Sequence, residues 1–89
     1  MTEEFKGFIG YPAIFTKAEN EQYFVEFPDL EGCFTQGGTI EEAVCRAQEA
    51  LAIYYLEKKG ELPSASALRS IRDENPNSVV QIIAIDTDN

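Results

Sequence analysis

The sequence has 89 residues, which is enough for one domain with one modest hydrophobic core. A formal net charge of −9 disfavours nucleic-acid binding, because a phosphate backbone would be repelled, and it would attract a basic protein partner. The chain has no histidine and only two cysteines, so neither a zinc site nor a disulfide framework is predicted.

Residues 1–6 lack the basic and apolar regions of a secretory signal. No apolar run approaches the roughly 18 residues that a membrane span needs. We therefore expect a cytoplasmic protein that does not bind membranes, with Cys33 and Cys45 both reduced. Because no internal repeat or long linker interrupts the chain, residues 1–89 are predicted to form a single domain.

Two strands joined by a polar turn are predicted near the start of the chain. Residues 10–17 place Tyr11, Ala13 and Phe15 on one face of a strand, residues 23–27 alternate between Tyr23, Val25 and Phe27 on one face and Phe24 and Glu26 on the other, and residues 18–22 between them are polar. Such a short connection predicts an antiparallel hairpin. Pro12 cannot donate to a ladder, so we expect it at the start of its strand or facing away from the neighbouring strand.

A turn-rich segment over residues 27–39 sets the predicted topology. Pro28 presets φ, Asp29 can bond its own backbone two residues on, and Gly32 tolerates a positive φ. The chain should therefore reverse here and continue as a brief strand over residues 33–36. The motif and turn residues that we single out are Phe27, Pro28, Asp29, Leu30, Gly32, Cys33, Thr35 and Gly37.

A long amphipathic helix is predicted to begin after Thr39. The Thr39 hydroxyl can accept a hydrogen bond from the backbone of Glu42, whose side chain can reach back to form a capping box. Gly60 fits the C′ position beyond the last turn. The apolar face that should meet the sheet recurs at helical spacing and consists of Ile40, Ala43, Val44, Ala47, Leu51, Tyr54 and Tyr55.

The last two turns of this helix are apolar on the opposite face as well, at Ile53 and Leu56. They need a second cover, from a later segment of the chain or from another molecule. The first candidate is a short helix predicted over residues 66–72. The sheet face away from the long helix should stay open and include Phe24. Ile53, Leu56 and Phe24 are therefore the candidate interface residues.

The predicted fold is α+β, with the element order βββαβ. The short helix of residues 66–72 should be capped by Ser64 or Ser66, and residues 79–85 are almost continuously apolar, as in a buried strand. A strand, a crossover helix and a strand imply a right-handed connection with parallel pairing. We therefore predict an antiparallel three-stranded meander, a crossover helix and a final parallel strand.

The sequence contains no convincing set of catalytic side chains. A metal-dependent nuclease would need clustered carboxylates, for which the candidates are Glu26, Asp29, Asp86 and Asp88. Asp86 and Asp88 are more simply explained as a solvated strand end and acidic tail, and Asp29 by turn chemistry. A catalytic cysteine would need a base such as histidine, which the sequence lacks. We assign no catalytic residue, cofactor or metal ligand.

The sequence resembles the N-terminal domain of HicB-type antitoxins. The resemblance is carried by residues 11–15 (YPAIF), 23–37 (YFVEFPDLEGCFTQG) and 39–43 (TIEEA), and by the long helix and the apolar last strand. It extends over residues 10–86. It implies a partial RNase H-like fold that lacks the catalytic carboxylate set of that superfamily.

The resemblance also implies a function. HicB-type proteins bind and neutralise HicA, a small basic RNA-cleaving toxin, in type II toxin–antitoxin systems, and they commonly form dimers or higher oligomers. Many carry a C-terminal domain that binds operator DNA. The sequence stops at Asn89, just after the last predicted strand, so we expect no such domain and no direct DNA binding.

Two alternatives stay open. One is a stand-alone HicB-like regulatory or structural oligomer without a toxin. The other is a minimal metal-dependent RNase H-like nuclease.

Overall fold

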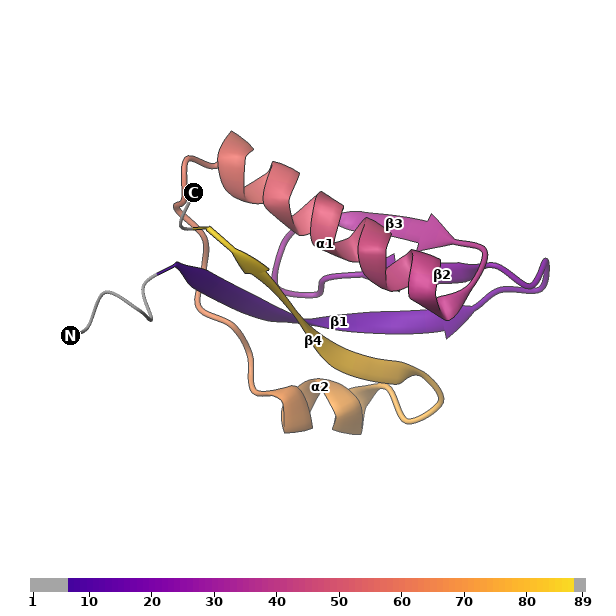
Figure 1. Ribbon diagram of the computed structural model, residues 1–89. Helices are drawn as coiled ribbons and strands as arrows, with labels where there is room; N and C mark the ends of the chain where they lie inside the picture. Colours follow the sequence, from indigo (N-terminus) through magenta and orange to yellow (C-terminus); the bar gives the residue numbers. More distant parts are fainter. Residues whose placement is uncertain (1–6, 88–89) are drawn as a thin grey trace.

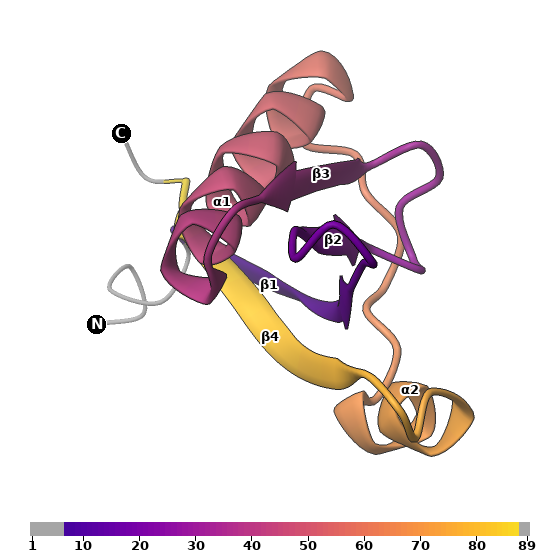
Figure 2. The same ribbon diagram turned by 90° about the vertical axis from the view of Figure 1, so that its right-hand side faces the viewer.

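The computed structural model describes residues 7–87, which form a sheet with a long helix on one face and a short helix on the other (Figures 1 and 2). The strands lie in the order β3-β2-β1-β4, and each neighbouring pair is antiparallel. In chain order the elements are β1 (Phe8–Lys17), β2 (Tyr23–Glu26), β3 (Phe34–Gly37), α1 (Ile40–Glu57), α2 (Leu68–Glu74) and β4 (Val79–Asp86). The α+β class and the antiparallel meander of the first three strands are confirmed.

The hairpin of β1 and β2 confirms the reading of residues 18–22 as a turn. The Ala18 N–H donates to the Gln22 carbonyl at 2.7 Å, and the Glu21 N–H donates to the Ala18 carbonyl at 3.1 Å. Glu21 takes a positive φ of 70°, which lets the chain reverse tightly. The ladder then pairs residues 14–17 of β1 with β2.

Pro12 lies within β1 and not at its start, because the strand begins at Phe8. It is opposite Ile82 in the β1–β4 register. On the β2 side, pairing begins only at Ile14. Pro12 thus lies outside the part of β1 that pairs with β2, so its missing N–H removes no hydrogen bond from that ladder.

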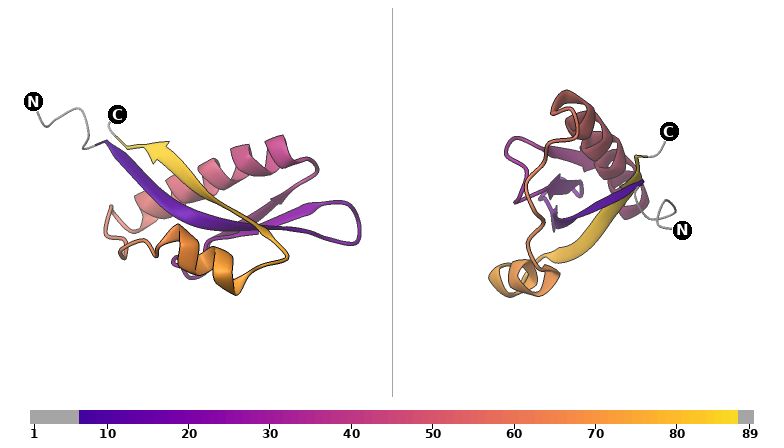
Figure 3. Two further views of the ribbon diagram at one scale, coloured as in Figure 1. Left: turned by 90° about the horizontal axis from the view of Figure 1, so that it is seen from below. Right: turned by 90° about the vertical axis from the view of Figure 1, so that its left-hand side faces the viewer.

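The prediction that the last strand pairs in parallel is wrong. β4 is antiparallel to β1, from Phe8 opposite Asp86 to Phe15 opposite Val79. After α1 has run back along the sheet, residues 58–67 and α2 carry the chain along its length again before β4 begins (Figures 1 and 3). This additional pass reverses the direction in which the last strand enters the sheet.

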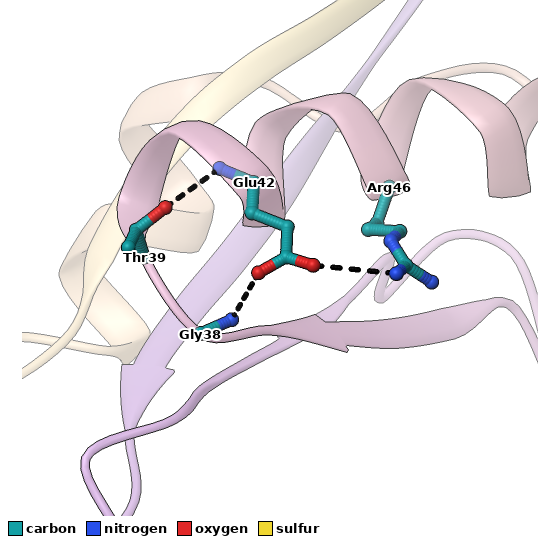
Figure 4. Close-up of polar contacts among 4 residues, drawn as sticks. All are labelled: Gly38, Thr39, Glu42 and Arg46. Atoms are coloured by element: carbon teal, nitrogen blue, oxygen red, sulfur yellow. Dashed lines mark hydrogen bonds and ion pairs between the residues drawn. The ribbon is translucent and has the colours of Figure 1, made fainter.

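The start of α1 is fixed by the predicted capping residues (Figure 4). The Glu42 N–H donates to the Thr39 hydroxyl at 3.1 Å, and one Glu42 carboxylate oxygen accepts from the Gly38 N–H at 2.8 Å. The other oxygen lies 3.2 Å from the Arg46 guanidinium. Glu42 therefore satisfies a backbone donor before the helix and extends the cap by one ion pair.

The end of α1 differs from the prediction by one residue. Lys58 is the C-cap, so C′ is Lys59, with φ of 54°, and Gly60 follows with φ of 77°. The N–H of Lys59 donates to the Leu56 carbonyl and that of Gly60 to the Tyr55 carbonyl, which is the Schellman pattern. Among residues 7–87, neither helix combines the length and the apolar character needed to cross a membrane.

The main core lies between α1 and the sheet. As the helical spacing predicts, Ala43, Ala47 and Leu51 of α1 are fully buried, with Tyr54 packed at the margin. Ile40, assigned to the same face, is exposed at the first turn. The remaining buried members of this core are Tyr11, Ala13, Phe15, Val25, Phe27, Leu30, Cys33 and Ile83.

The short helix α2 covers part of the other sheet face. Ile71, with Leu68 beside it, packs on Ile14 of β1 and Val80 of β4 to form a second, smaller cluster. Figure 2 shows α2 and the chain that leads to it on the side of the strands away from α1. The sheet face that we expected to stay open is thus covered over β1 and β4.

The prediction that this short helix covers Ile53 and Leu56 is therefore wrong. Both side chains stay exposed on α1. The predicted serine cap is also wrong, because Ala67 is the N-cap and makes no side-chain capping bond. Ser66 is instead hydrogen-bonded to Asp29, which fixes the chain before α2 starts.

Two side chains donate hydrogen bonds to backbone carbonyls on the outer edge of β4. The Gln48 amide of α1 donates to the Ala84 carbonyl at 3.3 Å. The Arg72 guanidinium of α2 donates to the Val80 carbonyl at 3.1 Å. Each helix therefore contributes one donor to the backbone of this edge strand.

Candidate functional site

The turn after β2, which contains most of the predicted motif residues, is held together by backbone hydrogen bonds and core packing. The Phe27 N–H donates to the Cys33 carbonyl at 3.1 Å, while Leu30 and Cys33 each donate to a carbonyl within the turn at 3.0 Å. Gly32 has φ of 80°, as predicted for this turn. Phe27, Leu30 and Cys33 are buried in the main core. The turn thus places the start of β3 against α1.

Asp29 ties this turn to the chain between the helices. Its carboxylate accepts from the Ser66 N–H at 2.8 Å and from the Ser66 hydroxyl at 2.6 Å, in place of the predicted bond to its own backbone. Close by, the Tyr11 hydroxyl donates to the Pro63 carbonyl. Burial, and then the charge of Asp29, raise the pKa of Tyr11 above its usual value. These contacts hold the chain between the helices in place.

The other motif residues lie along the path from the turn to α1. Pro28 is exposed, and Thr35 of β3 is half-buried opposite Val25. Gly37 ends β3 against the backbone of Ala43, where a side chain would not fit. With Thr39 at the helix cap, these residues set the approach of β3 to α1.

The candidate nuclease carboxylates form no metal site within residues 7–87. No group of three or more histidine, cysteine, aspartate or glutamate side chains in this range is placed to hold a metal ion. Asp29 is engaged with Ser66, Glu26 is exposed on β2, and Asp86 ends β4. Asp88 lies outside the described residues.

The two cysteines differ in surroundings. Cys33 is buried under the turn, with its sulfur 3.8 Å from the Ala50 carbonyl oxygen, and burial raises the pKa of its thiol to about 11. Cys45 is exposed on α1. Cys33 is therefore a packing residue held in its protonated form at neutral pH.

We expect a thiol reagent to label Cys45 and to spare Cys33 in the folded protein. At pH 8 the thiolate fraction of Cys33 would be on the order of 10⁻³, and its burial blocks access as well. Ellman's reagent should titrate one thiol rapidly and the second only in denaturant. A Cys45→Ser variant should lose the rapid phase. Rapid labelling of that variant without denaturant would contradict the burial of Cys33.

The structure brings two of the three candidate interface residues together. Ile53 and Leu56 are 56% and 72% exposed on the outward side of α1. Phe24 is on the far side of the sheet, because it alternates along β2 with Val25, which faces α1. Its ring lies 5.9 Å from that of Phe34, between centroids. We call Phe24 and Phe34 the aromatic patch, and Ile53 and Leu56 with Glu49 and Glu57 the helix flank.

The helix flank lies between two hollows. One, of about 210 Å³, is bounded by Cys33 and Phe34 at the start of β3 and by Ala50, Ile53, Tyr54 and Glu57 of α1. We call it the β3–α1 hollow. The other, of about 290 Å³, lies between Ala52, Tyr55 and Leu56 of α1 and Ile85, Asp86 and Thr87 at the end of β4. The sequence indicated neither, because each joins segments that only the tertiary fold brings together.

The helix flank carries two carboxylates, and one lysine, Lys58, lies next to Glu57 in the sequence. Glu49 and Glu57 lie one helical turn before and after Ile53, and neither forms an ion pair within residues 7–87. The ammonium group of Lys58 lies 5.3 Å from the centroid of the Tyr54 ring. The flank thus combines exposed apolar side chains with free carboxylates, a pattern suited to a protein partner that carries positive charge.

Known proteins share both the sequence pattern and the fold. A family model described as HicB_like antitoxin of bacterial toxin-antitoxin system matches residues 11–89. A 14.9 kDa protein from the rep-hol intergenic region of Haemophilus phage HP1 is 32% identical over 81 residues, which cover 85% of this chain and 60% of that protein. The chain spans less than two thirds of the length of the curated relatives it matches.

Two solved structures have a similar fold. The N-terminal domain of the Burkholderia pseudomallei antitoxin HicB gives a TM-score of 0.71 at 21% identity, over 88% of this chain and 99% of that one. A chain of a toxin–antitoxin complex from Streptococcus pneumoniae gives a TM-score of 0.73 at 30% identity, over 90% of this chain and 70% of that one.

Proposed function

Since this chain belongs to the HicB-like antitoxin family, we propose that it binds and neutralises a small basic HicA-like RNase toxin by protein–protein contact. It would do so in the cytoplasm, as the antitoxin of a type II system and as a homodimer or higher oligomer. The family match over residues 11–89 and the likeness to a chain of a solved toxin–antitoxin complex support the antitoxin role.

The helix flank is the surface of this chain best suited to bind such a toxin, because its exposed apolar side chains lie among carboxylates. A basic toxin would be drawn toward a chain of charge −9, and electrostatic attraction of this kind raises association rates. Apolar side chains at the centre of a contact and charges at its rim are the usual arrangement of a protein interface. Ile53 and Leu56 would supply the first, and Glu49 and Glu57 the second.

Replacing Ile53 with lysine should weaken binding of the HicA-like toxin about 10- to 100-fold, since it removes an apolar contact and adds a charge that repels a basic partner. The measurements are titration calorimetry with the toxin encoded in the same genome and inhibition of its RNA cleavage. Ile53 is 56% exposed, so the variant should fold like the wild type.

Val79→Lys is the matched control, because Val79 is 50% exposed and lies at the start of β4, away from the C-terminal half of α1 (Figure 1). It should bind and inhibit like the wild type. Full inhibition by Ile53→Lys would show that the helix flank is not the toxin surface. If the wild-type chain neither binds the toxin nor reduces its RNA cleavage, the proposed function is wrong.

A further inference from the structure

The β3–α1 hollow has the size of a site for one side chain. Its volume of about 210 Å³ is below the roughly 300–1,000 Å³ of most small-molecule pockets. Cys33, Ala50 and Ile53 give it apolar walls, and Glu57 supplies a carboxylate. Apolar walls with a carboxylate match a long cationic side chain, whose aliphatic stem packs while its charged end meets the acid.

The aromatic ring of Tyr54 attracts cations, and a hydrogen bond from its hydroxyl holds the ring in position. Its hydroxyl donates to the Glu31 carbonyl at 3.0 Å, which fixes the ring between α1 and the turn. The ammonium group of Lys58 already lies 5.3 Å from the ring centroid. A cation at this distance is attracted by the face of the ring. The chain's own lysine therefore occupies a position that a partner's cation would also favour.

Charge indicates that a different, basic protein binds at the helix flank in preference to a second copy of this chain. A second copy would bring another protein of charge −9 against Glu49 and Glu57, which have no ion pair within residues 7–87. Like charges placed together across an interface disfavour that contact. A partner rich in lysine and arginine would neutralise both carboxylates.

We propose that the β3–α1 hollow receives a lysine or arginine side chain of the basic partner, with its charged group between Glu57 and the Tyr54 ring and its stem along Ile53. Lys58 then competes with the incoming cation and limits the affinity. This inference rests on the proposed function, because it assigns a specific contact to the same toxin partner.

The test measures the affinity of the HicA-like toxin from the same genome for two pairs of variants. Glu57→Gln should weaken binding about 5- to 10-fold, because the partner's cation loses its carboxylate. Lys58→Ala should tighten binding about 3- to 5-fold at low salt, because the competing ammonium group is gone. Circular dichroism would check that both fold, as expected for exposed residues.

The matched controls change net charge in the same way elsewhere. Lys17→Ala also removes a lysine that lies over a tyrosine ring, since its ammonium group is 5.8 Å from the Tyr23 ring centroid. Glu19→Gln removes an exposed carboxylate from the β1–β2 turn. Both controls should shift the affinity less than about twofold.

Three results would overturn the proposal. If Lys58→Ala matches Lys17→Ala and Glu57→Gln matches Glu19→Gln, net charge explains the binding and the hollow takes no cation, while the proposed function stands. Weaker binding by Lys58→Ala would show that Lys58 contacts the partner and does not compete with it. Failure of the wild-type chain to bind the toxin would overturn this inference together with the proposed function.

Discussion

Gly37→Ala is expected to destabilise the domain by about 2–3 kcal/mol, because the added methyl group overlaps the backbone of α1. A Cβ at Gly37 would lie 2.6 Å from the nitrogen and 2.8 Å from the Cα of Ala43, and 3.0 Å from the carbonyl carbon of Glu42. Backbone atoms cannot move aside by changing a rotamer. β3 and α1 would have to separate, which loosens the packing around Ala43 and Ala47.

Urea and thermal unfolding followed by circular dichroism would measure this loss. For a domain of this size, the expected fall in Tm is about 10–20 °C. Gly38→Ala is the matched control, since the nearest atom to its Cβ, at 3.2 Å, is the carboxylate oxygen of Glu42 at the end of a flexible side chain. The control should cost less than about 1 kcal/mol. Equal stability of the two variants would contradict the close approach of β3 to α1.

Asp29→Ala is expected to cost about 2 kcal/mol and to release the chain that leads to α2. The aspartate carboxylate accepts two hydrogen bonds from Ser66, at 2.6 Å and 2.8 Å, in a partly buried position. Removing it leaves the Ser66 N–H and hydroxyl without their acceptor. Amide hydrogen exchange should therefore accelerate at Ser66 and its neighbours more than in the core strands.

Ser66→Ala separates the two bonds, because it removes the hydroxyl and keeps the N–H bond to Asp29. It should cost about 1 kcal/mol, roughly half the effect of Asp29→Ala. The same unfolding measurements compare the two variants. If Asp29→Ala is as stable as the wild type and Ser66 exchanges at an unchanged rate, Asp29 does not anchor this segment.

Local signals in the sequence predict the elements well. The cap of Thr39 and Glu42 and the helical spacing of Ala43, Ala47 and Leu51 give the start and the buried face of α1. The polar residues 18–22 give the first hairpin. Each of these features depends on contacts between residues close in sequence, which composition and spacing reveal.

The features that the sequence did not predict depend on contacts between distant segments. The antiparallel entry of β4 follows from the path of residues 58–74, which no local pattern specifies. Asp29 meets Ser66 across 37 positions. A short helix with few apolar residues could pack on either face of the sheet, and the core around Ile14 and Val80 decides its place. The sequence predicts surplus apolar surface at Ile53 and Leu56 and leaves open whether a later segment or another molecule covers it; within the described chain both side chains stay exposed.

The side-chain hydrogen bonds from Gln48 and Arg72 to the outer edge of β4 affect whether a strand from another molecule can extend the sheet. Exposed edge strands invite extension by a strand from another molecule, which leads to fibres and aggregates. Here an incoming strand would have to displace Gln48 from the Ala84 carbonyl and Arg72 from the Val80 carbonyl before it paired. Edge-to-edge growth of the sheet through β4 would therefore cost two side-chain hydrogen bonds, which disfavours fibre formation on this side of the molecule.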